Sequence, residues 1–158
     1  MKIKDAKLQV LLWSIAFPGF GQILNGKLLK GMFFILLEFL ININGHINLV
    51  IVASFHGEMQ RAVATANYQW LMFYPCIYMF AIWDSYKDAG GGAIPFAFLP
   101  FVFAAYSGTI GVIYSPSFSP GGFLLGPVFG PILLMLCGVV PGILLQRYLQ
   151  KAKATSRE

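Results

Sequence analysis

The chain has 158 residues, of which 58% are hydrophobic and only 11% are charged, and its mean hydropathy is +0.71. A typical soluble domain carries roughly 25% charged residues, so this chain has too little polar surface to cover a water-soluble globule. These figures exclude a soluble enzyme, a nucleic-acid-binding protein and a disordered linker, and they predict an all-α integral membrane protein. The formal charge of +5 then calls for an explanation in membrane topology, with no nucleic-acid partner.

The N-terminal residues imitate a signal peptide, with three lysines, a short apolar stretch and a small-x-small triplet at Ser14–Ala16. The apolar stretch Leu8–Trp13 is shorter than the roughly 7–15 residues of a signal-peptide core. We therefore expect this segment to be retained.

Four apolar runs further along the chain are candidates for membrane-spanning helices. About 20 helical residues cross a hydrocarbon core of roughly 30 Å, and three of the runs reach that length. The second run is shorter, but Trp70 and Trp83 stand near its ends, as interfacial aromatic residues do. The predicted organisation is a single membrane domain over 1–158, with a re-entrant or interfacial segment over 8–30 and transmembrane helices over 31–55, 68–84, 94–114 and 123–146.

The apolar stretch 8–24 is not predicted to be a fifth span. A proline and two glycines at positions 18, 19 and 21 interrupt it and disfavour a continuous helix. If the stretch does not cross, ten of the eleven basic residues lie on one side of the membrane and only Arg61 lies on the other. If it crosses, the split is four against seven. The positive-inside rule favours the first arrangement, which places both termini on the cytoplasmic side of the cell membrane.

The residues around this interruption read FPGFGQILNGKLLKGMFFILL, and an acidic residue ends the second apolar run. A Gly-rich turn, a second glycine before a basic residue and a glycine that opens the first helix resemble the TM2-domain family of small polytopic membrane proteins. The resemblance covers residues 8–88 and implies little chemistry, since most of that family has no assigned activity. The matching positions are Pro18, Gly19, Gly21, Gln22, Gly26, Lys27, Gly31 and Asp84.

Glu38 lies within the first predicted span, where a charged carboxyl costs about 3 kcal/mol on insertion scales. Asn42 and His46 follow at i+4 and i+8, so all three would share one face of a continuous helix. One interpretation is a polar path for protons, ions or solutes, in which His46 titrates near neutral pH. The other is a hydrogen-bond network between helices. The second is the more common use of such residues.

The fourth run has a glycine pattern. Gly122, Gly126 and Gly130 repeat every four residues, and Gly138 and Gly142 keep the same register. Small residues at this spacing let another helix approach closely. The pattern predicts a glycine zipper, either against a partner such as a second copy or a larger membrane complex, or against a helix of the same chain.

The sequence contains no motif typical of catalysis, and Cys76 and Cys137 lie singly in apolar runs. We therefore expect no enzymatic activity, no metal and no other cofactor. The favoured function is an accessory subunit or scaffold that acts through helix–helix and lipid contacts. The alternative is a small ion, proton or solute conduit that uses the Glu38–Asn42–His46 face.

Overall fold

The computed structural model describes residues 3–155, which contain α-helices and 3-10 turns but no strand. The all-helical class expected from composition is confirmed. Two helices, α3 and α9, are long and apolar enough to cross a membrane, and α8 is a shorter apolar helix. The elements are α1 (Ile3–Ala16), α2 (Phe20–Leu24), α3 (Leu28–Gly45), α4 (Ile47–Phe55), α5 (Met59–Thr65), α6 (Tyr68–Leu71), α7 (Tyr74–Asp88), η1 (Gly91–Ala93), α8 (Leu99–Tyr114), η2 (Pro120–Gly122) and α9 (Gly126–Thr155).

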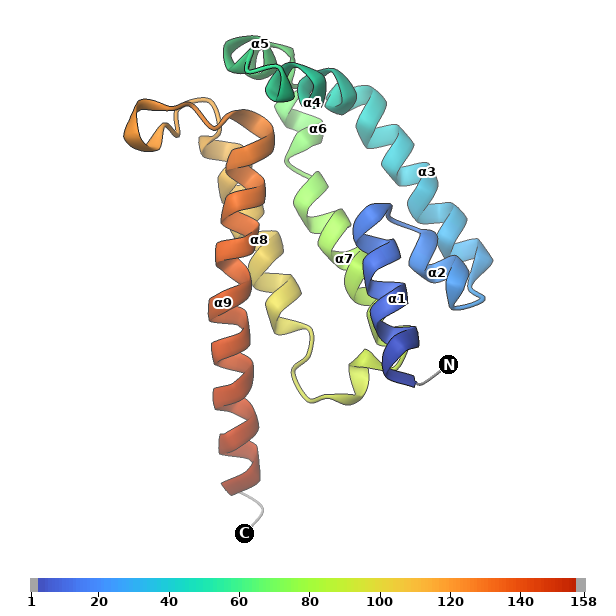
Figure 1. Ribbon diagram of the computed structural model, residues 1–158. Helices are drawn as coiled ribbons and strands as arrows, with labels where there is room; N and C mark the ends of the chain where they lie inside the picture. The colour runs from blue at the N-terminus through green and yellow to red at the C-terminus, as the bar shows by residue number, and fades with distance from the viewer. Residues whose placement is uncertain (1–2, 156–158) are drawn as a thin grey trace.

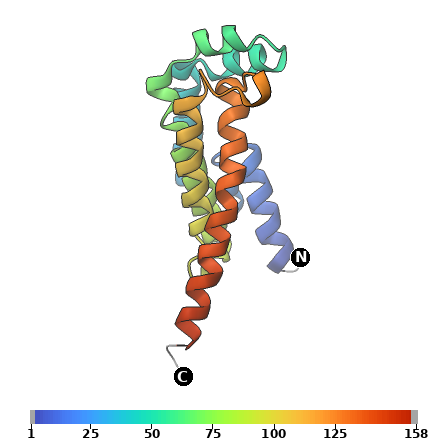
Figure 2. The same ribbon diagram turned by 90° about the vertical axis from the view of Figure 1, so that its left-hand side faces the viewer.

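The long helices run alongside one another in alternating directions (Figure 1). Helices α4 and α5 lie across the end of the molecule where α3 finishes, while the first and last described residues lie toward the opposite end. The most extensive contact between two helices is that of α8 with α9, and α9 extends well beyond α8 at its C-terminal end (Figures 1 and 2).

The N-terminal segment is a helical hairpin. Helix α1 ends at Ala16, the chain turns through Gly19 at a φ of +103°, and α2 returns toward the end at which α1 begins (Figure 1). Only glycine adopts this φ without strain, which is why the helix breaks here. Both helices pack on α7, and the Tyr78 hydroxyl of α7 donates a hydrogen bond of 2.6 Å to the Ile15 carbonyl oxygen of α1.

The first predicted span is not one helix. Helix α3 ends at Gly45, His46 adopts a left-handed conformation with a φ of +56°, and α4 starts at Ile47. The His46 backbone N–H bonds the carbonyl oxygens of Asn42 and Ile43, which satisfies the end of α3. The prediction of an unbroken helix over 31–55 is therefore wrong. Helix α3 alone is still about 27 Å long, close to the thickness of a hydrocarbon core.

Prolines shift the starts of the next two helices. The run from Tyr68 divides into α6 and α7, because Pro75 has no backbone N–H and stands in the first turn of α7. Helix α8 starts at Leu99 and not at 94, since Pro95 and Phe96, the latter with a φ of +60°, form a turn before it. The last predicted helix, 123–146, instead begins with α9 at Gly126 and continues to Thr155.

Candidate functional site

Two aspartates at the end of α7 are surrounded by three lysines. Asp84 is only 5% exposed, and its carboxylate accepts hydrogen bonds from Lys30 Nζ at 2.9 Å and from Lys87 Nζ at 3.4 Å. Asp88, one turn later, pairs with Lys30 at 3.2 Å and with Lys27 at 3.3 Å. The lysines are nearly half exposed, so cations reach the buried Asp84 carboxylate and the partly buried Asp88 carboxylate from the solvent side.

Amide side chains from α2 and its C-cap add to this cluster. Gln22 is fully buried, and its Nε2 donates to the Ala81 carbonyl oxygen at 2.8 Å and to Asp84 Oδ2 at 3.3 Å. Asn25 Nδ2 donates to the Ser85 carbonyl oxygen at 2.8 Å. These bonds give side-chain donors to the Ala81 and Ser85 carbonyl oxygens, in the last turns of α7, and so hold α2 against this end of the helix.

Glycines allow the close packing of α1, α2 and α3 in this region. A Cβ on Gly21 would clash with the Ser14 hydroxyl and lie 2.8 Å from Ser85 Cβ. A Cβ on Gly31 would lie 2.9 Å from the Gly19 carbonyl oxygen. We call this packed region, residues 14–31 with 81–88, the N-terminal junction.

The N-terminal junction gathers the positions that carry the TM2-like pattern. Pro18 and Gly19 are buried and form the turn of the junction. Gly21 and Gly31 lie where helices approach most closely. Gln22, Lys27 and Asp84 make its polar contacts. Gly26 turns the chain with a φ of +74° and has open space around it.

Sequence reasoning missed six other polar members of the junction. For the charged members the signal was the helical spacing, since residues three or four apart share a face and so cluster their charges. This spacing relates Asp84 to Asp88 and Lys27 to Lys30. The missed residues are Ser14, Asn25, Lys30, Ser85, Lys87 and Asp88.

A second feature is a cavity of about 690 Å³ between α1, α3, α4, α6, α7, α8 and α9. Its wall is almost entirely apolar, and the polar exceptions are Glu38, Tyr74 and Tyr78. Two lining residues, Ile15 of α1 and Leu136 of α9, are themselves 47% and 64% exposed. The cavity therefore opens to the outside of the helix bundle beside α1 and α9.

Glu38 places its carboxyl at the wall of this cavity. It is 9% exposed, and its Oε1 accepts a hydrogen bond of 3.1 Å from the Tyr74 hydroxyl. The Tyr78 ring stacks on Tyr74 at a centroid distance of 5.5 Å, but its hydroxyl is directed to the backbone of α1. Among residues 6–155, Tyr74 is the one hydrogen-bond donor to the Glu38 carboxyl, so Oε2 accepts no hydrogen bond from these residues.

Asn42 and His46 do not join Glu38. Asn42 Nδ2 donates to Asn48 Oδ1 at 3.0 Å, and His46 Nδ1 donates to the Thr65 carbonyl oxygen at 3.1 Å. Because α3 ends before His46, the expected i, i+4, i+8 face is interrupted. The structure places these three predicted site residues in three separate contacts.

The contact between α8 and α9 uses two of the five glycines predicted to pack helices. A Cβ on Gly138 would lie 2.6 Å from the Phe103 carbonyl oxygen, and one on Gly142 would lie 2.6 Å from Pro100 Cα. Close helix approach at these positions therefore occurs within one chain.

The other three glycines of the pattern have different surroundings. A Cβ on Gly130 would have only ordinary contacts, at 3.8 Å or more. Gly126 is the first residue of α9, has a φ of +65° and approaches Met59. Gly122 lies in η2, before α9 begins, and has open space around it, so it packs against no helix of the described chain.

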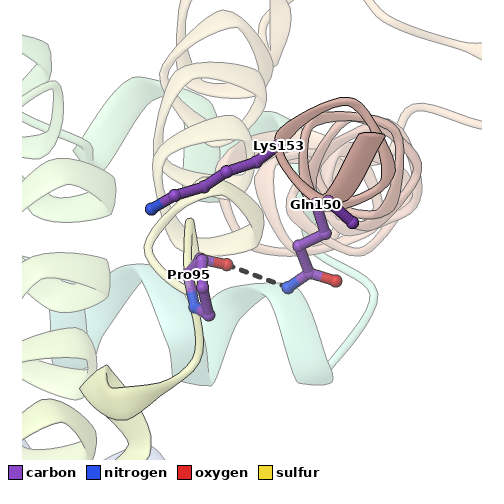
Figure 3. A pocket seen from close by; sticks show the side chains of 4 residues that line it. Pro95, Gln150 and Lys153 are labelled. Atoms are coloured by element: carbon purple, nitrogen blue, oxygen red, sulfur yellow. Dashed lines mark hydrogen bonds between the residues drawn. The ribbon is translucent and has the colours of Figure 1, made fainter. Parts of the chain in front are cut away.

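A smaller hollow of about 290 Å³ lies between the C-terminal part of α9 and the turn before α8, lined by Pro95, Gln150, Lys153 and Ala154. Figure 3 shows Gln150 bonded to the Pro95 carbonyl oxygen, at 2.9 Å, with the Lys153 side chain extended over the same turn. This hydrogen bond holds the end of α9 against the turn. Lys153 is the one charged residue among the four that line the hollow.

The described residues contain no group of three or more His, Cys, Asp and Glu side chains placed to hold a metal ion. Cys76 and Cys137 are free and exposed on different helices. No protein family, curated protein or solved structure matches the chain.

Proposed function

We propose that the chain is a four-span membrane protein that acts without catalysis, as an accessory subunit or scaffold, through helix–helix and lipid contacts. The observation that carries this proposal is the apolar outer surface of its helices. Large hydrophobic side chains are more than half exposed on several helices, which hydrocarbon or a partner helix would accommodate and water would not. Examples are Leu29, Phe33 and Ile43 of α3, Val102 and Tyr106 of α8, and Leu136, Leu144 and Tyr148 of α9.

The proposed spans are α3, α6 with α7, α8, and α9. Their alternating directions bring Lys27, Lys30, Lys87 and Lys153 toward one end of the bundle, whereas Arg61 lies on α5 at the other end. This distribution supports a cytoplasmic location for the lysine-rich end and for both termini. In this arrangement the α1–α2 hairpin is a re-entrant segment, and the N-terminal junction supports a relationship to TM2-like proteins.

The outer face of α9 is the surface we propose for a partner, which is a second copy or another membrane subunit. Helix α9 has 30 residues and α8 only 16, so much of the C-terminal half of α9 has no antiparallel neighbour. Leu144 and Tyr148 lie there, one turn apart, and are 60% and 69% exposed. Gly138 and Gly142 face α8 instead.

The alternative, a conduit along the Glu38–Asn42–His46 face, has less support. Each of these side chains is bonded to a different element: Glu38 to α7, Asn42 to α4 and His46 to the end of α5. A relay of protons or ions needs polar groups in sequence along a path. Only Glu38 reaches the cavity, whose other walls are apolar apart from two tyrosines.

Native mass spectrometry after extraction in a mild detergent tests the scaffold proposal. We expect a homo-oligomer or a stoichiometric complex with one other membrane protein, and we expect Leu144→Trp to dissociate it. The matched control is Ile43→Trp on α3, whose side chain is also largely exposed and which should leave the complex intact. A monomer in all three preparations, with no associated protein, would overturn the proposal.

A further inference from the structure

We propose that the cavity beside Glu38 binds a lipophilic amine or alcohol, with the apolar body of the molecule in the cavity and its hydroxyl or ammonium group on the Glu38 carboxyl. This inference rests on the membrane embedding proposed above, because the cavity opens at the apolar outer surface of the bundle. It adds a ligand that the scaffold role does not require.

The size of the cavity favours a small molecule over a protein segment. Its volume of about 690 Å³ lies within the usual range for ligand pockets, about 300–1,000 Å³. A helix about 10 Å in diameter would fill this volume with fewer than two turns, roughly, which is too short to be a stable partner helix.

The wall of the cavity favours a ligand whose larger part is apolar. Helices α1, α4, α6, α7, α8 and α9 contribute aliphatic, aromatic and proline side chains to it, including Leu11 of α1, Leu71 of α6 and Val139 of α9. Burying apolar surface against such a wall is favourable, and a charged or highly polar molecule would lose its hydration there without replacement.

The Glu38 carboxyl determines which polar group of the ligand is favoured. Glu38 is nine-tenths buried, and its Oε1 is already bonded by Tyr74. Its Oε2 accepts no hydrogen bond from residues 6–155, and Glu38 lines the cavity. An acceptor that is kept out of water gains most from one hydrogen-bond donor, and a hydroxyl or ammonium group supplies it.

Photocrosslinking in lipid nanodiscs tests this site with the full-length chain. The probes are hexadecylamine and hexadecanol that each carry a diazirine and an alkyne, and the competitors are unlabelled hexadecylamine, hexadecanol and hexadecane. We expect saturable labelling of peptides from α1, α7 or α9 that both polar competitors suppress about tenfold more strongly than hexadecane does. Labelling that hexadecane suppresses equally well would overturn the assignment of Glu38.

Two pairs of adjacent residues supply matched variants. Val139 lines the cavity and Val140 does not, and the same holds for Leu11 and Leu12. We expect Val139→Phe and Leu11→Phe each to reduce labelling at least fivefold, roughly, and Val140→Phe and Leu12→Phe to leave it unchanged. The second pair keeps the test decisive if Val139→Phe fails to fold. Equal labelling within both pairs would overturn the proposal.

The variant Glu38→Gln separates the two polar groups. Glutamine keeps an acceptor for Tyr74 but cannot carry the negative charge that strengthens binding of an ammonium group. If the occupant is an amine, we expect labelling by the amine probe to fall about tenfold and labelling by the alcohol probe to fall less. If the occupant is an alcohol, we expect similar small losses of labelling for both probes. Unchanged labelling by both probes would overturn the role of Glu38. Absence of the unsubstituted chain from the membrane fraction would instead contradict the membrane embedding of the proposed function.

Discussion

The hydroxyls of Ser14 and Ser85 lie 2.6 Å apart and both side chains are completely buried, although 71 positions separate them in the chain. Ser14 also donates to the Val10 carbonyl oxygen within α1, at 2.8 Å. This contact holds α1 against the last turns of α7, and Gly21 of α2 closes over it without a side chain of its own. The N-terminal hairpin is therefore an integral part of the bundle.

The first prediction concerns Gly21. In Gly21→Ala the new methyl group would meet both serines, so we expect a loss of about 1–3 kcal/mol in unfolding free energy, as overpacking in a tight core produces. The measurement is the unfolding midpoint in detergent, followed by tryptophan fluorescence. Gly130→Ala is the control, because its Cβ would make only ordinary contacts. A stable Gly21→Ala protein would mean that α2 does not pack here as described.

The second prediction concerns the ion pairs of α7. Asp84→Asn removes the charge that Lys30 and Lys87 neutralise, and we expect it to cost about 1–3 kcal/mol, since the carboxylate is buried but its cations are partly exposed. The comparison is Glu58→Gln, which breaks the exposed pair with Arg61 and should cost about 0.5 kcal/mol or less. The measurement is the unfolding midpoint of each variant. Equal losses of unfolding free energy in the two variants would contradict the burial of Asp84.

The sequence predicted the N-terminal junction in outline because its signals are local. Proline and glycine mark the turn between α1 and α2, and the basic residues after it predict a segment that returns to the same side. The partners of Asp84 were not predictable in this way. Lys30 and Gln22 are 54 and 62 positions away, and only the packing of α2 and α3 on α7 brings them together.

The break at His46 shows a second limit of sequence reasoning. A left-handed residue at a helix end is usually glycine, but here glycine occupies position 45 and histidine adopts the left-handed conformation. Without that conformation, Glu38, Asn42 and His46 would form the continuous polar face that their spacing predicts. The cavity beside Glu38 could not be predicted from the sequence either, because seven helices far apart in the chain form it.

The third prediction concerns the contact between α8 and α9. In Gly142→Ala the added Cβ would lie 2.6 Å from Pro100 Cα, and backbone atoms cannot move aside as a flexible side chain does. We expect a loss of about 1–3 kcal/mol in unfolding free energy, again against Gly130→Ala, with the oligomeric state of the folded fraction unchanged. A dissociated but equally stable protein would place Gly142 at an interface between chains instead.

The last prediction tests the proposed orientation in the membrane. In a background where alanine replaces Cys76 and Cys137, single cysteines are introduced by His56→Cys, in the exposed turn between α4 and α5, and by Lys153→Cys near the end of α9. An odd number of spans separates these positions in the proposed topology, so a membrane-impermeant maleimide should label His56→Cys in intact cells and Lys153→Cys only after permeabilisation. Phe39→Cys, in the middle of α3, is the control that hydrocarbon should protect in both conditions. Labelling of His56→Cys and Lys153→Cys from the same side would mean that an even number of spans separates them, which contradicts the proposed topology. Labelling of Lys153→Cys alone in intact cells would mean that the orientation is the reverse of the one proposed.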